Sequence, residues 1–184
     1  MCLQGCMVIF TGTALQGAYI VDIEPVEDER GFFARSWCRE EFGAHGLHCH
    51  FVQSNISFNR RKGTLRGMHY QVKPNEEAKL VRCTRGAIYD VIIDLRSQSR
   101  TFTQWAAVEL TAANYRMLYV PEGFAHGFQT LDDDTEVFYL MSEFYHPECG
   151  RGVRWDDPAF GIAWPHSEGR IISDTDNAYP DFQR

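Results

Sequence analysis

Apolar and polar residues alternate along several short segments of the chain, and alternation at period two is typical of β-strands. The segments that we expect to be strands are 18–24, 51–57, 87–95, 103–110, 116–120 and 136–142. One short helix is predicted, with Ser36 as its N-cap, 39–42 as its body and Gly43 as its stop. The chain has no β-α-β rhythm and no internal repeat. We therefore predict an antiparallel sandwich or barrel whose interior holds the functional site.

The segment 63–94 carries the strongest chemical signal, because it is expected to place His69, Lys79 and Asp90 on neighbouring strands. Alternation also puts Asp90 and Asp94 on one strand face together with large aliphatic residues. A carboxylate in such surroundings must be paired or hydrogen-bonded, because an isolated buried charge is costly or takes up a proton. His69 and Lys79 are the nearest candidate partners. A purely structural role for Asp90 and His69 fits this segment equally well.

Length and composition favour a single domain over residues 1–184, since a chain of this size buries roughly 70% of the surface that it exposes when unfolded. No apolar run approaches the ~20 residues that a membrane-spanning helix needs, so we expect no membrane partner. The net charge of −7 argues against a nucleic-acid partner, because phosphate binding depends on lysine and arginine. An anionic ligand must therefore be met by a local group of cations.

The six cysteines form no CxxC motif, and a chain of this size does not need disulfides to fold. We interpret them as reduced thiols of a cytoplasmic protein. His48 and His50 have the spacing of a metal-binding pair, but no third ligand accompanies them, and we expect no metal.

Other polar residues are placed where they could meet a ligand. Gln53 and Asn55 share one strand face, and an amide pair suits a neutral polar group such as a base or a sugar. In the segment 121–128, glycines flank His126 and permit a close backbone approach to a ligand or a sharp bend. Either face of the predicted strand that carries Tyr139 could point into the core. Tyr139 could therefore be a packing residue or an acid.

Taken together, these motifs resemble the dTDP-4-dehydrorhamnose 3,5-epimerase family, from about residue 18 to residue 176. The motifs that carry the resemblance, in order, are Arg30-Gly31-Phe32-Phe33, Gln53-x-Asn55-x-Ser57, Leu65-Arg66-Gly67-x-His69-x-Gln71, Lys79-Leu80-Val81-Arg82-Cys83, Asp90-x-x-x-Asp94, the segment 121–128 and Trp164-Pro165. The resemblance implies a mainly all-β fold, an antiparallel jelly-roll or cupin-like barrel with a few short helices, in a homodimer. It also implies epimerisation of a nucleotide-diphosphate-linked 4-keto-6-deoxy sugar at C3 and C5, without cofactor or metal.

The resemblance assigns roles to individual residues. It implies that His69 is the general base, Asp176 its carboxylate partner and Lys79 the cation near the C4 oxygen. Tyr139 is implied as the acid on the opposite face of the sugar. The further site residues that it implies are His126 and Asp90, and the residues expected at the nucleotide sugar are Arg30, Phe33, Gln53, Asn55 and Arg66.

These residue types suit the removal of a proton next to a ketone. Such a proton can be removed only if the enolate oxygen is stabilised as its charge develops, which Lys79 would do. An imidazole with a pKa near neutrality can take the proton, and a carboxylate at its other nitrogen fixes its tautomer. Inversion then requires a proton donor on the far face, which is the role left for Tyr139.

Three positions depart from the family pattern. Arg35 stands where an acidic residue is common, Gly150 where a glutamate is frequent, and Thr175 where a lysine often precedes the aspartate. All three are expected to lie toward the nucleotide or its phosphates. The departures leave the chemistry intact but leave the identity of the nucleotide open.

Other functions fit parts of the same pattern. The alternatives within the same chemistry are a 3- or 5-mono-epimerase and a 3,4-ketoisomerase acting on another nucleotide-linked 4-keto-6-deoxy sugar. A metal-dependent cupin enzyme would need a triad of histidine and carboxylate ligands, and its usual HxH motif is replaced here by His69-Tyr70-Gln71. A non-catalytic cupin that binds sugar nucleotides would need neither base nor acid.

Overall fold

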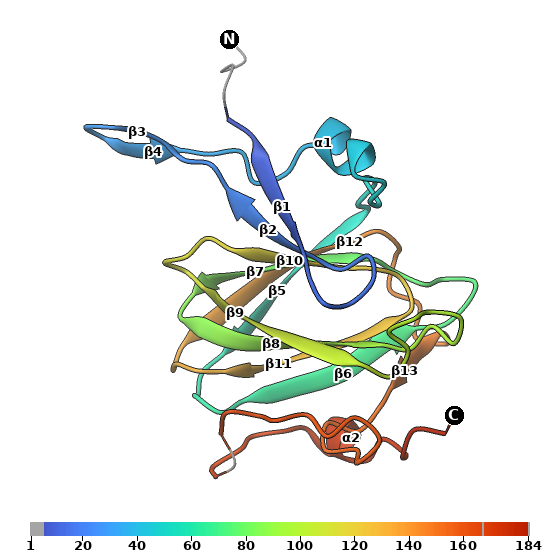
Figure 1. The fold of residues 1–184 in the computed structure, drawn as a ribbon. Coiled ribbons are helices and arrows are strands. Elements are labelled where there is room, and N and C mark those ends of the chain that lie inside the picture. The colour runs from blue at the N-terminus through green and yellow to red at the C-terminus, as the bar shows by residue number, and fades with distance from the viewer. Residues whose placement is uncertain (1–5, 167, 184) are drawn as a thin grey trace.

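The computed structural model describes residues 6–166 and 168–183 and contains two antiparallel sheets that face each other (Figure 1). The larger sheet has six strands in the order β1 (Val8–Gly12), β2 (Tyr19–Ile23), β10 (Met117–Val120), β7 (Lys79–Arg85), β12 (Thr135–Met141) and β5 (Gln53–Asn59). The second sheet has five, in the order β13 (Gly150–Gly152), β6 (Leu65–Gln71), β11 (Phe124–Thr130), β8 (Ala87–Asp94) and β9 (Trp105–Thr111). The expected all-β jelly-roll architecture is confirmed.

All six segments predicted as strands are strands, within about two residues at each end. The helix is also present, as α1 (Arg39–Ala44), and it begins at Arg39 as predicted, but its N-cap and its stop differ from the prediction. Its N-cap is Cys38, which is extended and makes no side-chain capping bond, so Ser36 lies outside the helix. At the other end Gly43 lies within the helix, because the backbone N–H of His45 closes the last turn. A second helix, α2 (Asp174–Asn177), was not predicted.

The main hydrophobic core fills the space between the sheets. It combines side chains from facing strands, including Val81 of β7, Ile88 and Ile92 of β8, and Phe124 of β11. The alternation predicted for β8 is confirmed, since Ile88 and Ile92 face this core while Val91 packs on the opposite side. Burial of both faces explains why nearly the whole strand is apolar.

A further layer covers the outer face of each sheet. Phe42 of α1 packs on the six-stranded sheet together with Val21 and Leu80. The C-terminal segment 153–182 crosses the five-stranded sheet, where Val153 and Phe160 join its buried side chains (Figure 1). This segment carries α2 to the lower edge of the barrel (Figure 1). The backbone N–H of Leu65 donates a hydrogen bond to the carbonyl oxygen of Ile171, and the N–H of Ile171 donates one to that of Gly63, which attaches the segment at the start of β6.

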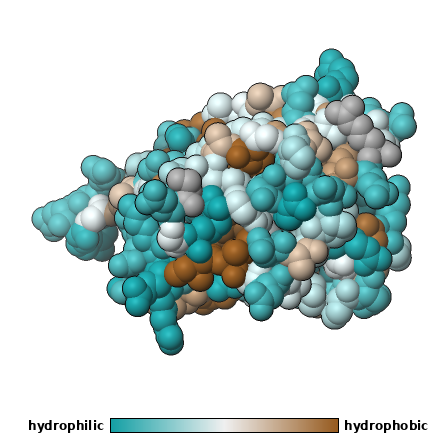
Figure 2. All heavy atoms as spheres, turned by 90° about the horizontal axis from the view of Figure 1, so that it is seen from below, coloured by the Kyte–Doolittle hydropathy of each residue, from teal (hydrophilic) through white to brown (hydrophobic). Residues whose placement is uncertain are grey.

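The hairpin of β3 (Val26–Asp28) and β4 (Gly31–Phe33) projects away from the barrel (Figure 1). Its apolar side chains are exposed, with Val26 at 43%, Phe32 at 42% and Phe33 at 59% of their full accessibility. Figure 2 shows the molecule from below, where most of the surface is hydrophilic and hydrophobic atoms are exposed over a limited area. Among the described residues, neither helix is long or apolar enough to cross a membrane.

Candidate active site

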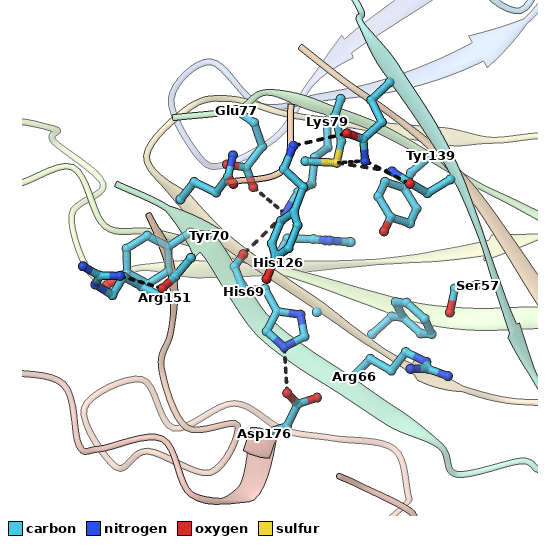
Figure 3. A pocket seen from close by; sticks show the side chains of 18 of the residues that line it. Ser57, Arg66, His69, Tyr70, Glu77, Lys79, His126, Tyr139, Arg151 and Asp176 are labelled. Atoms are coloured by element: carbon cyan, nitrogen blue, oxygen red, sulfur yellow. Dashed lines mark hydrogen bonds and ion pairs between the residues drawn. The ribbon is translucent and has the colours of Figure 1, made fainter. Parts of the chain in front are cut away.

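A cavity of about 700 Å³ is lined by residues of both sheets and of α2 (Figure 3). This volume lies within the range of about 300–1,000 Å³ that is usual for small-molecule sites. Eight of the eleven residues proposed from the sequence line the cavity, namely Gln53, Asn55, Arg66, His69, Lys79, His126, Tyr139 and Asp176. The remaining three are Arg30, Phe33 and Asp90.

His69 on β6 and Asp176 in α2 form a hydrogen-bonded pair. Nε2 of His69 lies 2.7 Å from Oδ1 of Asp176 (Figure 3). The carboxylate also accepts a hydrogen bond of 3.2 Å from the backbone N–H of Gly67. Ser173 caps α2 by accepting a hydrogen bond from the backbone N–H of Asp176. The side chain of His69 remains 44% exposed, so the ring is accessible from the cavity.

The charge of Asp176 decides which tautomer His69 adopts. Burial alone would raise the pKa of the Asp176 carboxyl, but the hydrogen bonds from His69, Gly67 and the Ser173 cap outweigh it and hold the pKa below 3.8. The carboxylate is therefore ionised at neutral pH and has no proton to donate. Nε2 of His69 must supply the proton of their hydrogen bond, which leaves Nδ1 of the neutral ring free to accept one.

Two glycines bring β6 and β11 unusually close beside this pair. A Cβ on Gly67 would lie 2.5 Å from the Cα of Gly127, and the φ of Gly67 is +127°. A Cβ on Gly127 would lie 2.7 Å from the carbonyl oxygen of Arg66. The register of the two strands shifts at this point, between His126 and Phe128. The expected close approach at the glycines of the segment 121–128 is thus present, although the neighbouring group is β6 rather than a ligand.

Lys79 and Glu77 form a buried ion pair in the wall of the cavity. Nζ of Lys79 lies 2.9 Å from Oε1 of Glu77, and the two side chains are 9% and 4% exposed. Nζ also lies 3.5 Å from the backbone carbonyl oxygen of His69. Because a buried ammonium is costly unless it is paired, Glu77 allows Lys79 to remain a cation beside the cavity.

Tyr139 reaches the cavity from β12, in the sheet opposite to the one that carries His69. Burial raises the pKa of the Tyr139 phenol, the charge of Arg66 lowers it, and the charge of Glu77 raises it. Together these effects leave the pKa above the ordinary value of 10. The hydroxyl is therefore protonated at neutral pH. A proton acceptor and a proton donor thus stand on the two sheets that enclose one cavity.

His126 on β11 also lines the cavity and donates a hydrogen bond of 2.7 Å from Nε2 to Oδ1 of Asp90. Asp90 is completely buried behind His126, and it does not line the cavity. The sequence-based expectation that His69 and Lys79 are the partners of Asp90 and Asp94 is wrong. Asp90 pairs with His126, while Asp94 accepts hydrogen bonds from the side chains of Arg96, Ser99 and Thr101.

The placement of His69, Lys79 and Asp90 on neighbouring strands was also wrong. β6 and β8 both pair with β11 and so are separated by one strand, whereas β7 belongs to the facing sheet. The reason is that the chain crosses from one sheet to the other between β6 and β7 and crosses back between β7 and β8. Lys79 therefore approaches the cavity from the side opposite to the strand that carries His69.

Polar side chains for a larger ligand lie on β5 and β6. Gln53 and Asn55 share the cavity face of β5 as predicted, and Nε2 of Gln53 donates a hydrogen bond of 3.0 Å to Oδ1 of Asn55. Nε of Arg66 donates a hydrogen bond of 2.7 Å to Oδ1 of Asn59. The remaining guanidinium nitrogens of Arg66 make no hydrogen bond to any of the described residues.

Arg30 and Phe33 do not line the cavity of their own chain within the described residues, because both lie on the projecting hairpin. The side chain of Arg30 is 84% exposed and pairs with Asp28 of the same hairpin. Of the three departures, Gly150 and Thr175 line the cavity, but Arg35 does not and instead pairs with Glu41 of α1.

The sequence analysis missed several residues that line the cavity: Tyr70, Gln71, Glu77, Tyr145, Arg151 and Tyr179. Glu77 could have been found, since it precedes Lys79 by two positions and shares its side of an extended segment. Tyr70 and Gln71 end β6 and Arg151 lies on the short strand β13, so these three are strand residues whose place in the cavity depends on how the sheets close. Tyr145 and Tyr179 come from a loop and from the C-terminal segment, where no periodicity indicates which side chains point inward.

No group of three histidine, cysteine or carboxylate side chains is placed to hold a metal ion within residues 6–166 and 168–183. Nδ1 of His48 lies 3.6 Å from a carboxylate oxygen of Glu122.

Comparison with known proteins gives one consistent result. The family model described as dTDP-4-dehydrorhamnose 3,5-epimerase matches residues 12–184. A dTDP-4-dehydrorhamnose 3,5-epimerase of Methanothermobacter thermautotrophicus is 45% identical over 169 residues, which cover 91% of this chain and 90% of that protein.

Solved structures agree with the sequence comparisons. The crystal structure of dTDP-4-dehydrorhamnose 3,5-epimerase from Elizabethkingia anophelis matches with a TM-score of 0.93 and 38% identity, over 95% of this chain and 96% of that one. The enzyme of the same name from Bacillus anthracis, with TDP and PPi bound, matches with a TM-score of 0.91 and 40% identity, over 96% of this chain and 100% of that one. The similarity therefore extends over the whole cavity and both sheets.

Proposed function

Because this chain belongs to the dTDP-4-dehydrorhamnose 3,5-epimerase family, we propose that it inverts C3 and C5 of dTDP-4-dehydro-6-deoxyglucose to give dTDP-4-dehydrorhamnose. The observation that carries this proposal is the arrangement of the cavity. A His69–Asp176 pair stands on one side of it, Tyr139 on the other, and the Lys79 cation lies in its wall.

In the proposed reaction, Nδ1 of His69 takes the proton from the carbon next to the C4 ketone. The electron pair of the broken C–H bond moves into the enolate, and negative charge develops on the C4 oxygen. Lys79 stabilises that charge, which is the largest contribution that a preorganised site makes to such a step. Tyr139 then donates its phenolic proton to the opposite face of the same carbon, which inverts the configuration.

His126 has a supporting role in this proposal. Its ring lines the cavity and is held from behind by Asp90, whose other oxygen, Oδ2, is buried without a hydrogen-bond partner among the described residues. We assign to His126 a hydrogen bond to the sugar, and to Asp90 the orientation of the ring.

The nucleotide is proposed to lie along β5, where Gln53 and Asn55 offer amide groups and Arg66 offers a guanidinium. A diphosphate carries about two negative charges, and the forked guanidinium of arginine matches phosphate oxygens. The Bacillus anthracis enzyme was solved with TDP and PPi bound, which supports a thymidine nucleotide here. The family often carries a glutamate at the position of Gly150 and a lysine at the position of Thr175. Both residues line the cavity, which therefore lacks those two charges here.

We further propose a homodimer in which each hairpin serves the partner's cavity. Arg30 and Phe33 stand in the family's substrate-binding positions, yet the hairpin directs them away from their own barrel. Exposed apolar residues also lie on β5, which is an edge strand of its sheet, with Ile56 at 65% and Phe58 at 44% exposure. An unpaired edge and exposed apolar side chains are what a partner surface would cover.

Mixing two inactive variants tests the shared site. Arg30→Ala and His69→Asn homodimers should both be inactive, but unfolding and refolding them together should restore activity. The mixed dimer contains one cavity with an intact His69 and an intact hairpin from the other chain. Absence of any recovery, with mixed dimers demonstrated by mass spectrometry, would mean that Arg30 acts within its own chain.

A cytoplasmic location is proposed as well. The cysteines in the described residues, at positions 6, 38, 49, 83 and 149, are all free thiols. Free thiols are usual in a reducing compartment.

The reaction itself is tested by incubating the protein with dTDP-4-dehydro-6-deoxyglucose in deuterated water. We expect deuterium at both C3 and C5 and a product with both centres inverted, identified by nuclear magnetic resonance. Label at one carbon only would indicate a mono-epimerase, and movement of the keto group to C3 would indicate a ketoisomerase. Binding without any label would contradict the enzymatic function.

A further inference from the structure

Tyr179 is an aromatic residue of the cavity wall to which the proposed reaction gives no role. It follows α2 in the C-terminal segment and is half-buried. Its ring centroid lies 6.0 Å from that of His69, with the ring planes at 73° to each other. Edge-to-face pairs of this kind are worth about 0.5–1.5 kcal/mol beyond the area that they bury.

Gly152 provides the space in which the Tyr179 ring lies. A Cβ at position 152 would lie 2.3 Å from Cε2 and from Cζ of Tyr179, so the ring packs directly on the glycine backbone. Gly152 is paired with His69 across the β13–β6 ladder. The absence of a side chain at position 152 therefore places the Tyr179 ring beside the imidazole.

The backbone on both sides of Tyr179 is anchored. Upstream, the carboxylate of Asp176 accepts a hydrogen bond from the backbone N–H of Gly67. Downstream, the backbone N–H of Phe182 donates a hydrogen bond to the buried carboxylate of Asp157, and the Phe182 ring packs on Phe160 at 5.2 Å between centroids. The position of the Tyr179 ring is thus fixed by contacts other than the one with His69.

The bond to Cβ and the hydrogen bond at Nε2 hold two points of the imidazole, and the ring can still rotate about the line that joins them. A second contact is needed to hold the direction of Nδ1, and a base that points wrongly by about 1 Å can lose 10²-fold in rate. We propose that Tyr179, packed on Gly152, is a positioning residue that holds the ring of His69 in the orientation required for proton abstraction. This inference rests on the proposed function, because it assumes that His69 is the base.

Two separate substitutions test this role. Tyr179→Leu removes the ring, and Gly152→Ala displaces it without changing residue 179. Each should lower kcat about tenfold, with KM kept within about twofold, because orientation of the base rather than substrate binding is lost. The rate of deuterium incorporation from the solvent should fall by the same factor. Tyr179→Phe should retain kcat within about threefold, since the ring and not the hydroxyl contacts His69.

The double variant separates positioning from a general loss of structure. If Gly152→Ala acts only through the ring, adding it to Tyr179→Leu should cost nothing more, and the total loss should stay near tenfold. The matched controls are Gly12→Ala, at a strand glycine whose added Cβ would lie 4.0 Å from Cε1 of Tyr19, and Tyr89→Leu, at a half-buried tyrosine packed on Trp164. Both should keep the wild-type kcat.

The experiments distinguish a failure of the positioning role of Tyr179 from a failure of the proposed function. If the wild-type protein shows no exchange at all, the epimerase proposal is wrong. If the wild-type protein is active and Tyr179→Leu keeps its kcat, Tyr179 has no positioning role. A loss near a hundredfold in the double variant would also overturn the inference, because it would show that the two residues act independently.

Discussion

Oδ1 of Asp176 lies 2.7 Å from Nε2 of His69, although 107 positions separate the two residues in the chain. His69 belongs to the sheet, whereas Asp176 belongs to the C-terminal segment that crosses beneath it. The parallel bridge between Thr64 and Ile171 and the hydrogen bond from Gly67 hold that segment against β6. The acid–base pair therefore forms only when the C-terminal segment is docked against β6.

His69→Gln should abolish deuterium incorporation at C3 and C5, because it removes the proposed base. Asp176→Asn should reduce the rate by about 10²- to 10⁴-fold, since an amide no longer fixes the Nε2–H tautomer of His69. Both variants should still bind the product nucleotide, as measured by calorimetry. Equal activity of Asp176→Asn and wild type would show that the hydrogen bond is only structural.

Tyr139→Phe should keep part of the solvent exchange while losing net inversion. Abstraction by His69 does not require the phenol, but reprotonation from the opposite face does. The measurement compares deuterium incorporation with product formation in the same sample. If exchange disappears as completely as inversion, the roles of Tyr139 and His69 have been assigned to the wrong faces of the sugar.

Lys79→Met should destroy activity and also lower the free energy of unfolding by about 3–5 kcal/mol, because it leaves Glu77 charged and unpaired in the protein interior. Adding Glu77→Gln should restore most of that stability but none of the activity. Urea unfolding and turnover assays on both variants check the two effects separately. Recovery of activity in the double variant would mean that the cation of Lys79 is not needed for the enolate.

Asp94 should make the protein sensitive to acid. Burial would raise the pKa of this carboxyl, but hydrogen bonds from Arg96, Ser99 and Thr101 lower it from 3.8 to about 2. A carboxyl whose pKa is lower in the folded state stabilises the fold above pH ~4, and the stabilisation, about 2 kcal/mol, is lost between pH ~4 and ~2. The difference in unfolding free energy between wild type and Asp94→Asn should shrink over that range. A difference independent of pH would contradict this assignment.

Activity should survive treatment with EDTA, because the proposed mechanism stabilises the enolate with Lys79 rather than with a metal ion. Turnover is measured before and after chelation, with dialysis into metal-free buffer as the second condition. Loss of turnover that one divalent ion restores would require a different mechanism.

Six strand segments and most of the residues that line the cavity could be predicted from the amino-acid sequence. Alternation at period two is a local property of the chain, so the strands and the shared face of Gln53 and Asn55 could be predicted without a structure. The order of motifs indicated the family and eight residues that line the cavity. Among these, His69 and Asp176 were paired through the family resemblance and not through any local signal.

Which side chains contact each other became clear from the folded molecule alone. Asp90 was expected beside His69 or Lys79, but the strand order β6-β11-β8 brings His126 to it instead. Strand order and the path of the C-terminal segment depend on contacts between distant parts of the chain, which periodicity does not encode. The same reason explains why the partner of Lys79 and the position of Tyr179 became visible only in the folded molecule.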